Sequence, residues 1–127
     1  MSEAFIATAL VVTGAITASV VVVAIAPQTA LGLVFGAGRL DALTTLVARH
    51  WGLLVALVGG LLIYAAYHPD ARTPVMVAAI IEKFAIAVLV FGGSFRKKPV
   101  AALVAGADSA MALLYMAILA GLYAHNT

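Results

Sequence analysis

Four long apolar runs, separated by short polar turns, take up most of this 127-residue chain. Each run is about 20 residues long, the length that an α-helix needs to cross the hydrocarbon core of a bilayer. Hydrophobic residues make up 65% of the chain and charged residues only 9%, and the mean hydropathy is +1.18. Soluble domains are about half apolar and a quarter charged. The sequence therefore excludes a water-soluble fold and predicts an all-α, integral-membrane four-helix transmembrane bundle.

We place the spans at residues 4–26, 42–67, 74–95 and 100–124, within a single transmembrane domain covering residues 1–127. The first run ends in the letters AIA, as at a signal-peptidase site. No Lys or Arg precedes it, the run is too long and Pro27 follows, so we expect a retained helix. Residues 28–40 form a glycine-bearing connector with apolar side chains, which we expect to lie in the membrane interface. Asp41 is predicted to cap the second helix.

The cations are distributed unequally between the two sides that four spans would create. The first and third loops carry five of them, whereas the opposite side carries only Arg72; the five are Arg39, Arg49, Arg96, Lys97 and Lys98. The positive-inside rule then places these loops in the cytoplasm and both termini in the periplasm of a bacterial inner membrane. The net charge of +2 accordingly reports orientation and predicts no nucleic-acid partner. A site for lipid headgroups is the alternative reading of the RKKP loop.

Polar residues inside the spans fall at two depths when a rise of about 1.5 Å per residue is applied. One predicted layer, about 12 Å below the outer surface, contains Thr13, Glu82, Lys83 and Tyr115. The second layer, nearer the cytoplasm, contains Asp108, Arg49, His50 and Ser19. Two acids and two bases in these layers allow a neutral, paired interior.

Glu82 and Lys83 interrupt the third run, and a charge at mid-membrane costs about 3 kcal/mol or more unless it finds a partner. We expect both to face the bundle interior, with Tyr115 and Thr13 as the partners of Glu82. Because its stem is long, Lys83 could instead extend toward the outer surface. Two roles stay open for these charges: they fix which helix touches which, or they form a proton relay or a polar binding pocket.

Small residues recur every four positions on two spans, where they would let helix backbones approach closely. These ridges are Gly52, Ala56 and Gly60 on the second span, and Ala102, Gly106 and Ala110 on the fourth. Packing within the chain is the first interpretation and dimerisation is the second. Thr13 and Thr17 stand one turn apart and are expected to face inward.

Several kinds of chemistry find no support in the sequence. There is no cysteine, which excludes disulfides, thiol catalysis and thiolate metal sites. His68, Asp70 and His125 fall on one side, but nothing in their spacing requires a metal, and we predict none. The chain has no phosphate-binding glycine loop and no nucleophile elbow. No cofactor is identified.

The stretch from Ala48 to Val90 contains RHWG at the opening of a span, a HPDARTP turn and EK in the next span. In these features the chain resembles small bacterial four-helix membrane proteins of the DoxX-like type. The resemblance implies a four-helix bundle. DoxX itself is associated with quinol oxidation, but none of the matched features is a catalytic signature, so no residue role is carried over.

The expected function is that of a small polytopic membrane protein, accessory or binding hydrophobic small molecules or lipids in a polar-lined pocket within the bundle. The candidate ligand-binding or proton-relay residues are Glu82, Lys83, Asp108, Tyr115, Arg49, His50 and Thr13. The alternatives are a small proton-coupled transporter, and an enzyme acting on a quinone or isoprenoid with Glu82 or Asp108 as acid–base group. The expected partners are the lipid bilayer, a hydrophobic small molecule, and a second copy of the chain or a larger membrane complex.

Overall fold

The computed structural model describes residues 2–125, with side chains described for residues 2–122. The described chain is all-helical, which confirms the predicted fold class. In order its elements are α1 (Glu3–Ala18), α2 (Val21–Ile25), α3 (Pro27–Phe35), α4 (Ala42–Tyr67), the 3₁₀ turn η1 (Pro69–Ala71), α5 (Arg72–Phe91), the 3₁₀ turn η2 (Ser94–Lys97) and α6 (Pro99–His125).

Four helical segments of the described chain are long and apolar enough to cross a membrane, namely Glu3–Ile25, Ala42–Tyr67, Pro69–Phe91 and Pro99–Leu122. Large apolar side chains such as Leu43, Leu89 and Leu103 stand exposed on the outside of these helices, as contact with lipid requires. The chain is therefore a multi-pass membrane protein. The first, second and fourth spans lie within a few residues of the predicted ones.

The third span differs most from its predicted range of 74–95. It starts earlier because η1 leads directly into α5, and Pro74 falls in the first turn, where a proline costs no hydrogen bond. It ends earlier because Gly93 has extended backbone angles that leave the helix. Residues 94–97 then belong to the turn η2.

The first span is interrupted between α1 and α2. Thr17 Oγ1 donates a hydrogen bond to the Thr13 carbonyl at 2.8 Å, and the Ser19 hydroxyl donates to the Ile16 carbonyl. Such side-chain bonds back to the helix's own carbonyls compete with regular helical bonding and bend helices. The helix is broken at Ser19 and Val20, directly beside these two bonds.

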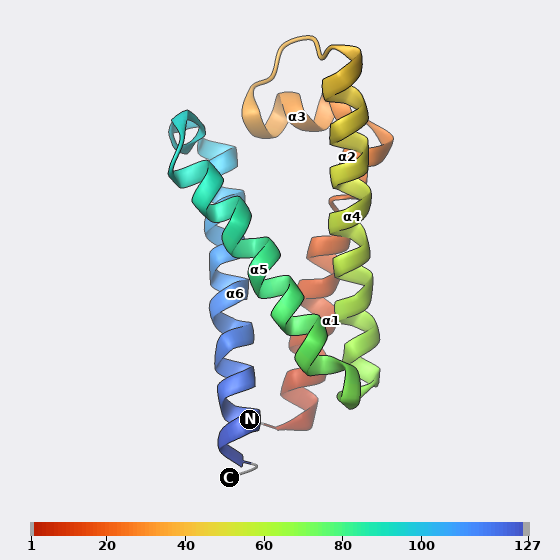
Figure 1. Cartoon of the computed structure of the whole chain (residues 1–127), viewed down its shortest axis with the longest axis vertical. Coiled ribbons are helices and arrows are strands. Elements are labelled where there is room, and N and C mark those ends of the chain that lie inside the picture. The colour runs from red at the N-terminus through yellow and green to blue at the C-terminus, as the bar shows by residue number, and fades with distance from the viewer. Residues whose placement is uncertain (1, 126–127) are drawn as a thin grey trace.

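The long helices form two hairpin-like pairs, α1–α2 with α4 and α5 with α6 (Figure 1). Both described ends of the chain lie at one end of the bundle, as four spans require, and α3 lies across the other end. Asp41 caps α4 as predicted, since its Oδ1 accepts a hydrogen bond from the Thr44 N–H at 2.7 Å. Hydrogen bonding from the Thr44 side chain, together with this backbone bond, holds the pKa of Asp41 below its usual range. The connector predicted at residues 28–40 is largely helical, because α3 extends to Phe35.

Helix α4 is in backbone contact with α1 and with α2 through glycines, but not through the full predicted ridge. A Cβ added at Gly59 would lie 2.6 Å from the Gly14 carbonyl oxygen, and one at Gly52 would lie 2.6 Å from the Ala24 nitrogen. At Gly60 an added Cβ would meet no atom within 4 Å. The prediction was wrong for Gly60, because seven residues nearly complete two helical turns, whereas eight exceed two turns by about 80°.

The ridge predicted on the fourth span also faces outward. Gly106 and Ala110 are exposed, and a Cβ added at Gly106 would meet nothing within 4 Å. The buried small residues of α6 are Ala101, Ala105 and Ala112 instead. The prediction that this ridge packs within the chain is therefore wrong for Gly106 and Ala110.

Arg72 joins three helices at the end of the bundle where the termini lie. Its guanidinium donates to both carboxylate oxygens of Glu3, at 2.7 and 2.6 Å, and to the carbonyls of Ala65 and Ala66, at 3.0 and 2.8 Å. These contacts connect the start of α5 to both neighbouring helices. This role of Arg72 was not predicted, because in the sequence it stands only as a cation in a loop.

Candidate functional site

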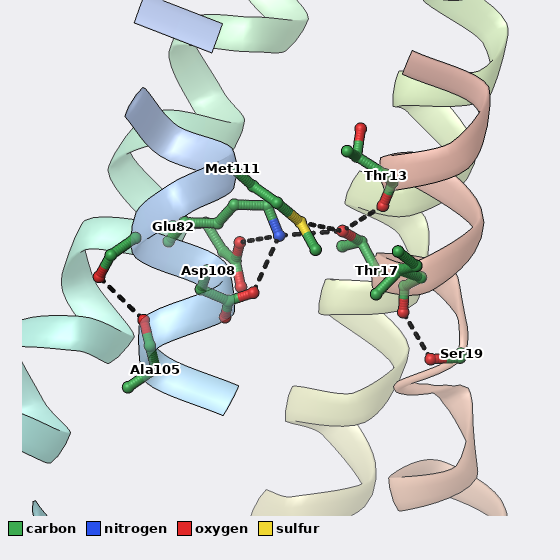
Figure 2. Close-up of polar contacts among 10 residues, drawn as sticks. Thr13, Thr17, Ser19, Glu82, Ala105, Asp108 and Met111 are labelled. Atoms are coloured by element: carbon green, nitrogen blue, oxygen red, sulfur yellow. Dashed lines mark hydrogen bonds and ion pairs between the residues drawn. The ribbon is translucent and has the colours of Figure 1, made fainter. Parts of the chain in front are cut away.

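Lys83 lies at the centre of the bundle with only 1% of its side chain exposed. Its Nζ donates a hydrogen bond to Thr17 Oγ1 at 2.9 Å and to Asp108 Oδ1 at 3.3 Å, and it lies 3.8 Å from Glu82 Oε2. We call Thr17, Glu82, Lys83 and Asp108 the Lys83 cluster. Figure 2 shows Thr17 on α1 and Asp108 on α6, with dashed contacts that run from each to the lysine nitrogen between them. The cluster therefore joins three spans.

Each member is held by its own helix. The hydroxyl of Thr17 donates to the Thr13 carbonyl, so its oxygen is free to accept from Lys83. Asp108 follows the buried Ala101 and Ala105 on the inner face of α6. Glu82 and Lys83 are neighbours about 100° apart on α5, and only their long side chains allow the 3.8 Å approach. The sulfur of Met111 lies 3.9 Å from Thr17 Oγ1 and covers one side of the cluster.

The cluster contains two carboxyl groups and one ammonium group. The prediction of a balanced set relied on Arg49, but Arg49 is exposed and donates to the Ala24 carbonyl at 3.3 Å. With both acids ionised the cluster would carry one net negative charge. A buried net charge is costly, so this site favours an additional proton or a positively charged ligand.

A cavity of about 300 Å³ extends from the cluster toward α3. Glu82, Lys83 and Asp108 line it together with apolar side chains from every long helix and from α3. Its walls include Val34 and Trp51. Its volume is within the range of about 300–1,000 Å³ typical of small-molecule sites, which combine apolar walls with a few placed polar groups.

Glu82 and Lys83 face the interior as predicted, but the predicted partners of Glu82 were wrong. Glu82 contacts Lys83, while the Thr13 hydroxyl donates to the Ala9 carbonyl at 2.7 Å. Tyr115 is fully buried, yet within the described residues neither its hydroxyl nor Glu82 Oε2 has a hydrogen-bond partner. Similar depth did not pair Glu82 with Thr13 or Tyr115, because depth says nothing about the direction in which a side chain points. Lys83 does not extend to the surface.

The predicted second polar layer does not form. Asp108 belongs to the Lys83 cluster, since the lysine side chain is long enough to reach across the difference in depth. Arg49, His50 and Ser19 are exposed, and Ser19 bonds to its own helix. Ser19 does line the cavity.

Sequence reasoning left Thr17 out of the candidate site, although it noted that Thr13 and Thr17 share a face. That shared inward face was the available signal. The contribution of α3 to the cavity had no such signal, because apolar residues in a connector equally predict contact with lipid.

Comparison with protein families, curated proteins and solved structures finds no match for this chain. The resemblance to DoxX-like proteins therefore stays a prediction.

Proposed function

We propose that this protein binds a hydrophobic small molecule in the cavity between α3 and the Lys83 cluster. The observation that supports this most directly is the pairing of apolar walls with three charged groups at one end of the same cavity. A ligand with an apolar body and one polar end matches this arrangement.

The charges favour a positively charged end on that ligand. Glu82 and Asp108 both line the cavity, while Lys83 supplies only one opposing charge. An alkyl ammonium group would balance the second carboxylate, whereas a carboxylate ligand would add to the negative charge. The ligand class is therefore an amphiphilic amine in preference to a fatty acid.

Trp51 makes a direct test practical, because it is the only tryptophan and it lines the cavity. The purified protein in detergent would be titrated with nitroxide-labelled alkyl amine, alcohol and carboxylic acid of equal chain length. We expect saturable quenching of Trp51 fluorescence, strongest for the amine and weakest for the acid.

A matched pair of variants separates cavity binding from partition into the micelle. Val104 lines the cavity, whereas Leu103 on the same helix is 71% exposed. Val104→Phe should weaken amine binding about tenfold, as overpacking by 1–3 kcal/mol implies, and Leu103→Phe should leave it unchanged. Linear, unsaturable quenching that is the same in both variants would rule the proposal out.

The second candidate function is a small proton-coupled transporter. It is favoured by the surplus carboxyl group in the Lys83 cluster, which offers a place for one proton. In proteoliposomes with a pH gradient, this function requires amine-driven proton flux that Asp108→Asn abolishes. Amine binding without proton flux would exclude the transporter and support only the small-molecule-binding function. The membrane-enzyme alternative, with Glu82 or Asp108 as acid–base group, stays a prediction without a further observation in its favour.

We also propose the finer location, a bacterial inner membrane with periplasmic termini, on the basis of the cation distribution. The partner proposed besides lipid and ligand is a second copy of the chain. The outward-facing Gly106 and Ala110 support this, because small residues on a lipid-facing surface permit close helix contact. Cross-linking in native membranes through Ala110→Cys would detect such a dimer.

A further inference from the structure

A second cavity, of about 620 Å³, lies beside the first at the α3 end of the bundle. It is bounded by α3, α4, α5, η2 and the loops that adjoin them, and its walls are almost entirely apolar. Lys98 is the one charged residue among those described as lining it. The cavity thus combines a large apolar volume with a single cation.

Two neighbouring features show that Lys98 lies beside the end of α3. Phe35 and Phe95 meet edge to face, with ring centroids 5.3 Å apart, and so hold α3 against η2. Gly36 ends α3 in the left-handed region at φ 67°. A Cβ added there would lie 3.3 Å from Lys98 Nζ and 3.7 Å from its Cε, so the lysine side chain lies along the end of α3.

The surrounding surface is positively charged. This end of the bundle carries Arg39, Arg49, Arg96, Lys97 and Lys98, against the single acid Asp41. Within the described part of the chain, none of these five cations is in an ion pair with a carboxylate. Arg96 donates to the Gly93 carbonyl at 2.8 Å, and that bond leaves its charge uncompensated.

We propose that this cavity binds an anionic phospholipid, with an acyl chain against the apolar walls and the phosphate at Lys98. The apolar volume requires an acyl chain, so a free phosphate ion would not fill the site. No carboxylate lines the cavity to receive the ammonium of a zwitterionic headgroup. The site does not include the Lys83 cluster, and the proposal does not rest on the function proposed for that cluster.

The experiment uses the full chain in detergent and phosphatidylglycerol with brominated acyl chains, since Trp51 also lines this cavity. We expect saturable quenching of Trp51 fluorescence. Brominated phosphatidylcholine of the same chain length should bind about fivefold more weakly, given about 1 kcal/mol for one cation near an anionic lipid.

Lys97 provides the matched control, because it has the same charge and lies in the same turn but is not among the lining residues. Lys98→Gln should weaken phosphatidylglycerol binding about fivefold. Lys97→Gln should leave it nearly unchanged, and Lys98→Arg should retain it. An unchanged Trp51 emission spectrum without lipid would show that the variants keep the wall of the cavity intact.

Three outcomes would overturn the proposal. Equal weakening by Lys97→Gln and Lys98→Gln would indicate only a general surface attraction. Equal quenching by the two lipids would indicate only partition of acyl chains. Competition by inorganic phosphate at millimolar concentration would indicate a phosphate site that needs no lipid.

Discussion

At the scale of single residues, Lys83 determines how the interior of this bundle is paired. It is almost completely buried and lies within 3.8 Å of oxygen atoms from Thr17, Glu82 and Asp108. Replacing one member of a buried charge pair leaves the other without a partner, which is far more costly than replacing the whole set. This contrast separates a structural contribution of the cluster from a functional one.

We expect Lys83→Met to lower the free energy of unfolding by about 3 kcal/mol, since it leaves two carboxyl groups, each about one-fifth exposed, without a cation. The triple variant Glu82→Gln, Lys83→Met, Asp108→Asn should recover most of that loss. Titration with a denaturing detergent, followed by Trp51 fluorescence, measures both. Lys97→Met is the control, because its side chain is exposed. A triple variant as unstable as Lys83→Met would contradict the pairing described here.

Arg72 gives a second prediction at this scale. Arg72→Gln removes both the pair with Glu3 and the hydrogen bonds to the carbonyls of Ala65 and Ala66. We expect a loss of about 2 kcal/mol or more in the free energy of unfolding, because hydrogen bonds to charged groups contribute about 1.5–3 kcal/mol. Glu3→Gln should have a much smaller effect, since the carbonyl contacts remain. Equal effects of the two variants would mean that the carbonyl contacts contribute little.

At the scale of helices, α4 approaches α1 closely at Gly59, which lies against the backbone of Gly14 and Ala18. An added Cβ at Gly59 would lie 2.6 Å from the Gly14 carbonyl oxygen, closer than such atoms normally come. The neighbouring Gly60 faces away from every other helix. Two adjacent glycines in one helix therefore have opposite tolerance to substitution.

Gly59→Leu should destabilise the bundle by about 1–3 kcal/mol or more, as expected for overpacking. Gly60→Leu should change the free energy of unfolding by no more than about 0.5 kcal/mol, as expected for a surface site. The two variants have the same composition, so a difference in their free energy of unfolding, measured by detergent titration, reports only the position of the added side chain. Similar losses for both would show that Gly60 also lies in a contact.

The sequence predicted the elements better than their contacts. Long apolar runs fix the number of spans, and charged turns fix their approximate limits, so four helices and the Asp41 cap were predicted correctly. Rise per residue gives depth along a helix but not rotation about it. Depth therefore predicted Glu82 beside Tyr115, whereas Glu82 pairs with Lys83. Spacing by four predicted Gly60 on the contact face, but rotation about the helix axis turns it outward. Nothing in the connector indicated that it would cover a cavity.

At the scale of the whole molecule, the two ends of the bundle differ in structure and in charge. The described termini and the α4–α5 turn lie at one end, and α3 with the cationic turns lies at the other (Figure 1). This arrangement supports the proposal that the cationic end faces the cytoplasm.

Single cysteines test that orientation cleanly, because the chain has none of its own. In intact cells, Asp70→Cys should react with a membrane-impermeant maleimide, and Lys97→Cys should react only after the cells are opened. Both positions are exposed, so the difference reports the side of the membrane. Labelling of Lys97→Cys in intact cells would show that the topology is the reverse of the proposed one.

Phe35, Trp51 and Ile86 line both cavities at once. A rotation of one of these side chains that enlarges one cavity reduces the other, because the same atoms form the partition between them. If both cavities bind the proposed ligands, the occupants would be coupled through this shared wall, and by thermodynamic linkage each would change the affinity for the other by the same factor. The lipid composition around the protein would in this way set how strongly the inner cavity holds its ligand.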